Sequence, residues 1–307
     1  MQQNISFTDI GKILKKNKST ISREVERNSG KKGYRHKQAH QFSVIRKINS
    51  KKHIRLTPAI QRLIERKLKV RWSPEQISNW IKKNKFGSIS HETIYSMIRV
   101  DREYGGILYT FLHQSNRKKR KKYGTGLTQK GSIKNRVSIE KRPKIVEEQK
   151  RIRDFEGDTI VGKNHQGSIV TLVDRKSLYL KMEVLQDRTS ESVSTAIKGM
   201  LESIKGNVHT ITFDKGKEFA NHEDISIMLD AKIYFADPYS FWQRAINENT
   251  NGLIRQYFPK KTDFSKITKK DIERIEFEIN NRPRKKLGYK TPHEVFWRQA
   301  SSDAVVS

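Results

Sequence analysis

The fold of the C-terminal half is decided by RIRDFEGDTIVG, residues 151–162, where a polar and basic chain changes to strand-forming sequence. Two further apolar runs follow it, GSIVTLVD at 167–174 and LYLKMEVLQ at 178–186, joined by the turn residues Asp174 to Ser177. Runs rich in β-branched and aromatic residues and bounded by such a turn are typical of β-strands. The sequence therefore predicts three consecutive strands.

Helical and strand-like segments alternate after these strands. One helical stripe in SESVSTAIKGMLESI consists of Val193, Ile197, Met200, Leu201 and Ile204. The short strands HTITFD at 209–214 and KIYFAD at 232–237 are separated by a second helix, NHEDISIMLD, which we expect to begin after a cap at Asn221. A third helix follows the fifth strand. This order predicts an α/β domain, with a mixed sheet covered by helices.

Three acidic residues occupy distinctive positions in this predicted domain. Asp158 lies in the first strand, Asp214 ends the fourth, and Glu248 opens the helix after the fifth, in INENTNGLIRQYFPKKTDF at 246–264. If the fourth strand lies beside the first, the two aspartates are neighbours, and a helix crossing that edge can bring Glu248 to them. Scattered acid triples are common, so a strand-end turn acid or a surface acid is the alternative for each aspartate.

Three converging carboxylates would repel one another unless cations were bound between them. Magnesium prefers hard oxygen ligands and keeps water or substrate phosphate in its shell. Two such ions can activate the attacking oxygen and stabilise the leaving oxygen of a phosphodiester. We therefore expect Asp158, Asp214 and Glu248 to bind two Mg²⁺ ions, for which Mn²⁺ substitutes.

Uncharged amides surround Glu248 even though asparagine and glycine are poor helix formers. Asn247, Asn249 and Asn251 can hydrogen-bond DNA or hold a carboxylate without competing for metal ions. Arg255 lies seven residues after Glu248, about two helical turns, so both should share a helix face. We expect Arg255 to hold substrate phosphate.

The charge of the chain indicates a polyanionic partner. The net charge is +31, of which residues 1–150 carry +27 and residues 151–307 carry +4. There are no cysteines, which excludes disulfides and thiolate metal sites. No apolar run approaches the roughly 18 residues of a membrane span, so we expect a soluble intracellular protein without a membrane partner.

Two segments of the basic half have the layout of a helix-turn-helix motif. In residues 6–28, Ser6 and Asp9 form a capping pair and Ser19 is expected to cap a second helix. We expect that helix to present four DNA-reading side chains, namely Thr20, Ser22, Arg23 and Arg27. The alternative is a generic basic helical hairpin.

The second such segment is residues 72–98. Ser73 should cap its first helix, with Pro74 and Gln76 in the first turn, and Ser90 should cap the next helix. A helical bundle without DNA contact is equally compatible with this pattern. The later run NRKKRKKYGTG indicates a linker that lies along DNA phosphates through Arg117, Lys118, Lys119 and Arg120.

Five ordered blocks in the C-terminal half resemble the DDE transposases of bacterial insertion sequences, most closely the IS-thirty family. The blocks are DFEGDTIVG, TLVDRKS, TFDKGKEF, ADPYSFWQRAINENTNGLIRQYFP and NNRPRKKLGYKTPHEVF, and they span residues 154–296. The N-terminal helix-turn-helix is similar as well. Where the family usually has Asp-Asn-Gly, this chain has Asp214-Lys215-Gly216, and Lys215 could either weaken metal binding or point away.

The resemblance implies an RNase H-like mixed sheet flanked by helices, preceded by an all-α helix-turn-helix region. It implies metal-dependent cleavage at terminal inverted repeats and transfer of the freed 3′-hydroxyl to target DNA. We expect further DNA contacts near the scissile phosphate from Gln243, Arg244 and Asn251, a homodimer or higher oligomer on double-stranded DNA, and a location on the bacterial nucleoid. The alternatives are a catalytically inactive repressor descended from a transposase and a basic RNA-binding protein.

The domain boundaries follow from these segments. We expect a helix-turn-helix at 1–30, a basic helical connector at 31–71, a second helix-turn-helix-like unit at 72–115, a basic linker at 116–148, the RNase H-like domain at 149–290, and a C-terminal helix and tail at 291–307.

Overall fold

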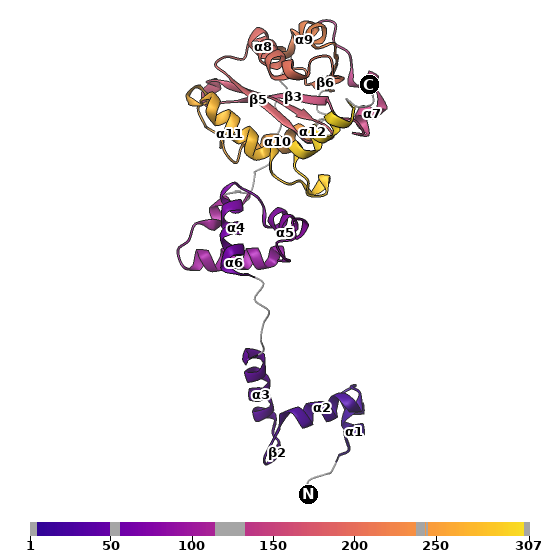
Figure 1. Ribbon diagram of the computed structural model, residues 1–307, viewed down its shortest axis with the longest axis vertical. Coiled ribbons are helices and arrows are strands. Elements are labelled where there is room, and N and C mark those ends of the chain that lie inside the picture. Colours follow the sequence, from indigo (N-terminus) through magenta and orange to yellow (C-terminus); the bar gives the residue numbers. More distant parts are fainter. Residues whose placement is uncertain (1–4, 50–55, 114–132, 238–242, 244, 304–307) are drawn as a thin grey trace, which may run out of the picture. The chain divides into compact units, whose positions relative to one another are not determined.

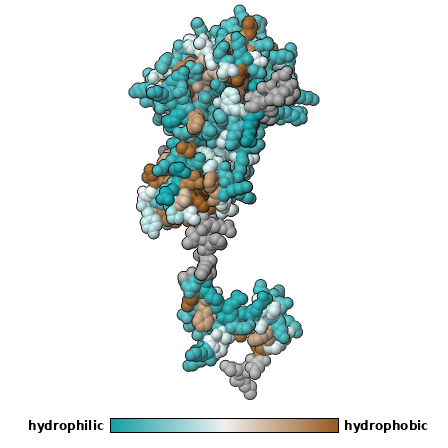
Figure 2. All heavy atoms as spheres, viewed as in Figure 1, coloured by the Kyte–Doolittle hydropathy of each residue, from teal (hydrophilic) through white to brown (hydrophobic). Residues whose placement is uncertain are grey.

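The computed structural model describes residues 5–49, 56–113, 133–237, 243 and 245–303. The chain divides into two compact units, Met1–Arg55 and Leu56–Ser307. Within the described ranges, no helix combines the length and the apolar character that crossing a bilayer requires. Hydrophilic side chains cover most of the visible surface in Figure 2.

Over residues 5–49, the described part of the N-terminal unit, the chain forms helices and a short hairpin (Figure 1). Its elements are α1 (Phe7–Ile13), α2 (Lys18–Asn28), β1 (Ser29–Gly30), β2 (Gly33–Tyr34) and α3 (His36–Asn49). Ser6 caps α1 by accepting from the backbone N–H of Asp9, as expected. The prediction that Ser19 caps α2 is wrong, because the side-chain oxygen of Asn17 accepts from the N–H of Ser19 and the helix begins at Lys18.

Residues 58–111 form a separate helical module of the second unit. It comprises α4 (Pro58–Lys69), α5 (Pro74–Lys83), α6 (His91–Glu103) and the 3₁₀ turn η1 (Leu108–Phe111). Ser73 and Gln76 form the expected capping box, and Ser90 caps α6. An apolar core holds the helices together through Ile64, Leu68, Trp72, Ile77, Ile81, Ile89, Ile94, Ile98 and Leu108.

A five-stranded mixed sheet forms the centre of the remaining part. Its strands are β3 (Asp154–Val161), β4 (Ser168–Asp174), β5 (Leu180–Leu185), β6 (Thr210–Phe213) and β7 (Lys232–Phe235). Their order across the sheet is β5-β4-β3-β6-β7. The β3–β4 and β4–β5 pairs are antiparallel, and the β3–β6 and β6–β7 pairs are parallel. The expected three consecutive strands and the mixed sheet are therefore confirmed.

Helices cover the two faces of this sheet (Figure 1). The α-helices are α7 (Lys144–Glu147), α8 (Ser190–Leu201), α9 (His222–Leu229), α10 (Ala245–Ile254), α11 (Lys269–Asn280) and α12 (Pro292–Asp303). Short 3₁₀ turns lie in the connections between elements, at Ile139–Lys141, Lys163–His165, Glu202–Ile204, Lys217–Phe219, Phe264–Lys266 and Lys285–Leu287. Apolar residues of α8 and α9 pack on one face of the sheet, and those of α10 and α11 pack on the other.

The alternation of side chains along β3 assigns its residues to these two faces. Phe155 belongs to the core beneath α8 and α9, and Ile160 belongs to the core beneath α10 and α11. Because successive strand residues point to opposite faces, Glu156 and Asp158 lie on the α10 face. Gly157 faces the other core, where an added Cβ would lie 2.3 Å from a ring carbon of Phe213, so a larger residue does not fit.

Candidate active site

The sheet register brings Asp158 and Asp214 to the same level. The parallel pairing of β3 with β6 matches Glu156 to Thr212. Continued by two residues, the same register sets Asp158 beside Asp214, on strands that lie about 4.8 Å apart in such sheets. The fourth strand of the sequence thus lies beside the first, which is the condition under which the two aspartates are neighbours. Asp214 follows the last residue of β6, and its Oδ1 accepts from the backbone N–H of Gly216 at 2.9 Å.

Asp158 is half-buried and is held by two hydrogen bonds to its carboxylate. Oδ1 accepts from the backbone N–H of Thr159 at 2.9 Å, and Oδ2 accepts from Nδ2 of Asn251 at 2.8 Å. Asn251 lies on α10, three residues after Glu248. The helix that carries the third acid is therefore attached directly to the first acid.

Glu248 itself is exposed in the first turn of α10. Over the described ranges, no three His, Cys, Asp or Glu side chains form a group that could hold a metal ion. The hydrogen bond from Asn251 thus brings α10 to Asp158, while Glu248 is not grouped with the two aspartates.

The oxygen atoms near Asp158 are nevertheless of the type that binds a hard divalent cation. Asp158 and Asp214 are half-buried, so their carboxylates can take part in a site that is partly shielded from water. The buried Oδ1 of Asn251 has no hydrogen-bond partner among the residues that the structure describes, and it adds an amide oxygen beside Asp158. Carboxylate and amide oxygens are ligands that magnesium accepts.

Arg255 lies in the turn directly after α10, which ends at Ile254, and is half-buried. Its Nη2 donates to the carbonyl oxygen of Val161 at 3.0 Å, and its guanidinium lies 5.5 Å from the ring centroid of Phe264. Burial lowers its pKa. Arg255 therefore holds α10 to the end of β3, and its expected contact with phosphate stays a prediction.

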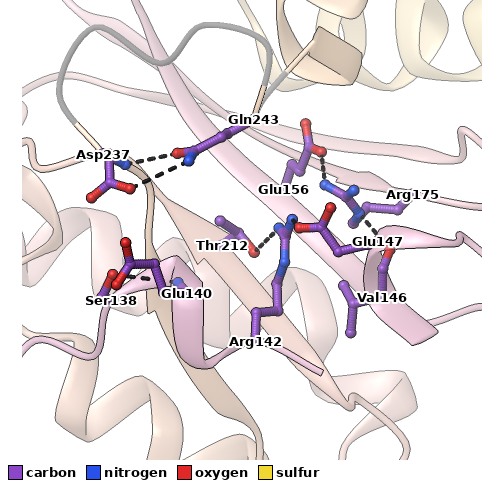
Figure 3. A network of polar contacts seen from close by, with 10 residues as sticks. All are labelled: Ser138, Glu140, Arg142, Val146, Glu147, Glu156, Arg175, Thr212, Asp237 and Gln243. Carbon is purple, nitrogen blue, oxygen red and sulfur yellow. Dashed lines mark hydrogen bonds and ion pairs between the residues drawn. The ribbon is translucent and has the colours of Figure 1, made fainter. Parts of the chain in front are cut away.

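Lys215, next to Asp214, is directed toward the neighbouring strand end. Its Nζ lies 3.5 Å from Oδ1 of Asp237, directly beyond β7. Gln243 forms two hydrogen bonds with the same aspartate (Figure 3). Its Oε1 accepts from the backbone N–H of Asp237 at 2.8 Å, and its Nε2 donates to Oδ2 of Asp237 at 3.3 Å. Lys215 thus forms an ion pair with Asp237. Of the two possibilities, that Lys215 weakens metal binding or that it points away, this contact favours the second.

The other predicted DNA contacts are distributed as follows. Thr20, Arg23 and Arg27 are exposed on α2, whereas Ser22 is half-buried. The Arg23 Nε donates to the carbonyl of Ser19 at 3.0 Å. Five predicted contact residues lie outside the described ranges, namely Arg117, Lys118, Lys119, Arg120 and Arg244. None of these contacts is tested by the fold.

A buried polar network around Glu156, which lies on the same strand as Asp158, was missed from the sequence (Figure 3). Glu156 accepts from Nη1 of Arg175 and from the backbone N–H of Asn247. Arg175 also donates to the carbonyl of Val146 at 3.0 Å. The sequence did contain one indication of this network. Glu156 lies two residues before Asp158, a spacing that puts both acids on the same face of a strand.

Glu218 is a second buried acid that sequence reasoning missed. Its Oε1 accepts from Thr159 Oγ1 at 2.9 Å and lies 3.0 Å from Nη2 of Arg188. Between Glu218 and Asp214 stands Gly216, where an added Cβ would lie 2.4 Å from Glu218 Oε2 and 2.8 Å from Asp214 Oδ1. Glycine at 216 thus lets both carboxylates pack against one backbone position.

Comparison with known proteins finds several transposases. The transposase for insertion sequence element IS4351 of Bacteroides fragilis is 41% identical over 99% of this chain and 94% of its own length. Transposase InsI for insertion sequence element IS30A of Escherichia coli K12 is 35% identical over 97% of this chain and 80% of its own. No protein-family model matches the chain.

Solved structures give a weaker likeness. The catalytic core domain of BIV integrase covers 50% of this chain and 98% of its own, with 17% identity and a TM-score of 0.39.

Proposed function

The chain belongs to the family of insertion-sequence transposases that includes those of IS4351 and IS30A, and on this premise we propose how it acts as a DNA transposase. The catalytic part is an RNase H-like domain of residues 149–290. Three antiparallel strands followed by two parallel ones, with helices on both faces, support this assignment. The N-terminal region binds the terminal inverted repeats of the element.

The observation that carries this proposal is the register of β3 against β6. Continued two residues beyond its last pair, Glu156 with Thr212, this register would set Asp158 level with Asp214. Asn251 ties α10, the helix that carries Glu248, to Asp158. The three carboxylates would together hold two Mg²⁺ ions, and Mn²⁺ would substitute. Bound there, the ions would lower the pKa of the attacking hydroxyl and offset the charge on the leaving oxygen.

The reaction consists of a phosphodiester hydrolysis followed by a transesterification. Water attacks the phosphorus at the element end, the bond to the 3′-oxygen breaks, and that oxygen leaves as a 3′-hydroxyl. The freed hydroxyl then attacks a target phosphodiester and displaces another 3′-oxygen. Glu248 would complete the ligand set, and Asn251 would orient Asp158.

The DNA contacts divide between the two units. Exposed side chains of α2, including Thr20, Arg23 and Arg27, would contact the terminal repeats. The basic run that contains Arg117 and Lys118 would add sequence-independent phosphate contacts. Because two element ends must be held together, we propose a homodimer or larger assembly on double-stranded DNA.

Cleavage of a labelled duplex that carries a terminal repeat tests the proposal. Asp158→Asn, Asp214→Asn and Glu248→Gln should each reduce Mg²⁺-dependent nicking to background while metal-free binding, measured by mobility shift, is retained. Asp224→Asn, at an exposed acid of α9, is the matched control and should cut like the wild type. A variant of the three that still cuts at a near wild-type rate removes that residue from the site.

The same assay separates the alternative functions. A repressor descended from a transposase would bind the repeat but leave it intact in Mg²⁺. An RNA-binding protein would prefer an RNA duplex of the same sequence. Either result with the wild-type chain would overturn the enzyme proposal.

A further inference from the structure

We propose that Glu156 is a positioning residue for Glu248, holding the first turn of α10 against the strand that carries Asp158. This inference rests on the proposed function, because it assigns a role in placing a catalytic acid. Glu156 would not touch DNA or metal itself. It would fix where the helix begins.

The geometry that carries the inference is a bridge from one buried carboxylate. Glu156 is 1% exposed and lies on β3, two residues before Asp158. One of its oxygens accepts from the guanidinium of Arg175. The other accepts from the backbone N–H of Asn247 at 3.2 Å, and Asn247 immediately precedes Glu248. A single side chain thus joins the sheet to the start of α10.

Glu156 supplies a hydrogen-bond acceptor that the N-terminus of α10 lacks within the helix. Asn247 is the third residue of α10, so its N–H has no acceptor within the helix. A carboxylate at a helix N-terminus also interacts favourably with the partial positive charge there. A buried N–H without an acceptor would be costly, and Glu156 removes that cost from the neighbouring strand.

Arg175 holds Glu156 in place. Both side chains are buried, with Arg175 5% exposed. Burial lowers the pKa of Arg175, and the charge of Glu156 opposes this shift. Because Arg175 also donates to the carbonyl of Val146, its guanidinium is anchored on the side away from Glu156. The carboxylate is therefore held rigidly on both sides.

Glu248 lies between two attachments of α10 to the same strand. The first is the Glu156 contact at Asn247, and the second is the Asp158 contact at Asn251, one turn later. Two points four residues apart fix both the height and the rotation of a helical turn. Loss of the first leaves the attachments at Asn251 and Arg255, which both lie C-terminal to Glu248. The first turn of α10, which carries Glu248, can then move away from the aspartates.

The test is Glu156→Gln, since an amide of similar size offers one acceptor oxygen where the carboxylate offers two. In metal-free, DNA-free protein, we expect amide hydrogen exchange in the peptide 245–254 to become at least about tenfold faster. The kcat for nicking should fall about 10- to 100-fold, because small misplacements of reacting groups have effects of this size. The Kd for the terminal repeat should stay within about twofold.

A double variant distinguishes positioning from stability. Glu156→Gln with Arg175→Gln removes both buried charges and should return the melting temperature toward the wild-type value. Positioning predicts that exchange at 245–254 stays fast and that kcat stays low in this variant. Recovery of kcat together with the melting temperature would show that Glu156 only stabilises the fold. Should Glu156→Gln alone fail to fold, the double variant carries the test.

A control variant and the wild-type chain complete the experiment. Glu273→Gln, at an exposed position of α11, should leave exchange and nicking unchanged. Wild-type exchange and kcat within twofold in Glu156→Gln would overturn the inference. A wild-type chain that does not nick at all would instead overturn the proposed function, while the exchange measurement would still decide whether Glu156 holds α10.

Discussion

The side-chain amide of Asn251 donates a hydrogen bond of 2.8 Å to Oδ2 of Asp158. This contact gives a physical reason for the uncharged residues around Glu248. A lysine at 251 would compete with cations for the carboxylate, and an acid would repel it. An amide orients Asp158 and leaves its negative charge in place.

The first prediction concerns this hydrogen bond. Asn251→Ala removes the donor, so Asp158 loses its tie to α10, and we expect the rate of nicking to fall at least about tenfold. Terminal-repeat binding without metal should be unchanged. Asn249→Ala is the matched control, because Asn249 is an exposed asparagine on the same helix. Equal losses in both variants would contradict a special role for Asn251.

Local sequence signals were sufficient for the arrangement of the strands. The apolar runs and the turn at Asp174 to Ser177 predicted β4 and β5, and the order of elements predicted a mixed sheet. That the fourth strand lies beside the first was only a condition for bringing the two aspartates together, and the structure meets it. The caps at Ser6, Ser73 and Ser90 were predicted as well. These features depend on residues that are close in sequence, where spacing determines the contacts.

Contacts between residues far apart in the chain could not be predicted from local spacing. The partners of Glu156 lie 19 and 91 residues away, and those of Glu218 include Thr159, 59 residues away. Nothing in the spacing of such residues indicates which buried acid meets which donor. Ser19 shows the same limit locally, because both Asn17 and Ser19 are good caps and the hydrogen-bond geometry chose Asn17.

The second prediction concerns Lys215. Its ammonium group is paired with Asp237, so it should not compete with cations at Asp214. We expect Lys215→Asn to leave the Mg²⁺ concentration for half-maximal nicking within about twofold of the wild type. Lys217→Asn, at an exposed lysine nearby, controls for the loss of one positive charge. If Lys215→Asn, but not Lys217→Asn, markedly lowered the Mg²⁺ concentration for half-maximal nicking, Lys215 would be shown to weaken metal binding.

The third prediction concerns the buried acid Glu218. Glu218→Gln should lower the free energy of unfolding by about 1–3 kcal/mol, because a buried hydrogen-bonded carboxylate loses its charge and an acceptor. Arg188 is 42% exposed, so Arg188→Gln should cost less than about 1 kcal/mol. Urea unfolding of both variants measures the difference. A larger loss for Arg188→Gln would mean that the ion pair dominates over the hydrogen bond from Thr159.

The fourth prediction concerns Asp174, a fully buried carboxyl at the end of β4. Burial raises its pKa from 3.8 to about 6, although hydrogen bonds from Ser177 and Arg153 oppose the shift. Between these two values the folded state binds more protons than the unfolded state. The contribution of Asp174 to stability is therefore fully present below pH 3.8 and is lost as the pH rises toward 6, by about 3 kcal/mol in all.

Asp174→Asn, which does not titrate, isolates this contribution. The free energy of unfolding of the wild type minus that of the variant should decrease as the pH is raised from 4 to 7, in urea titrations at constant ionic strength. Asp224→Asn should give a difference with little slope over the same range, because Asp224 is exposed. Parallel curves for the wild type and Asp174→Asn would show that Asp174 ionises in the folded protein as it does in the unfolded chain, and that its hydrogen bonds outweigh its burial.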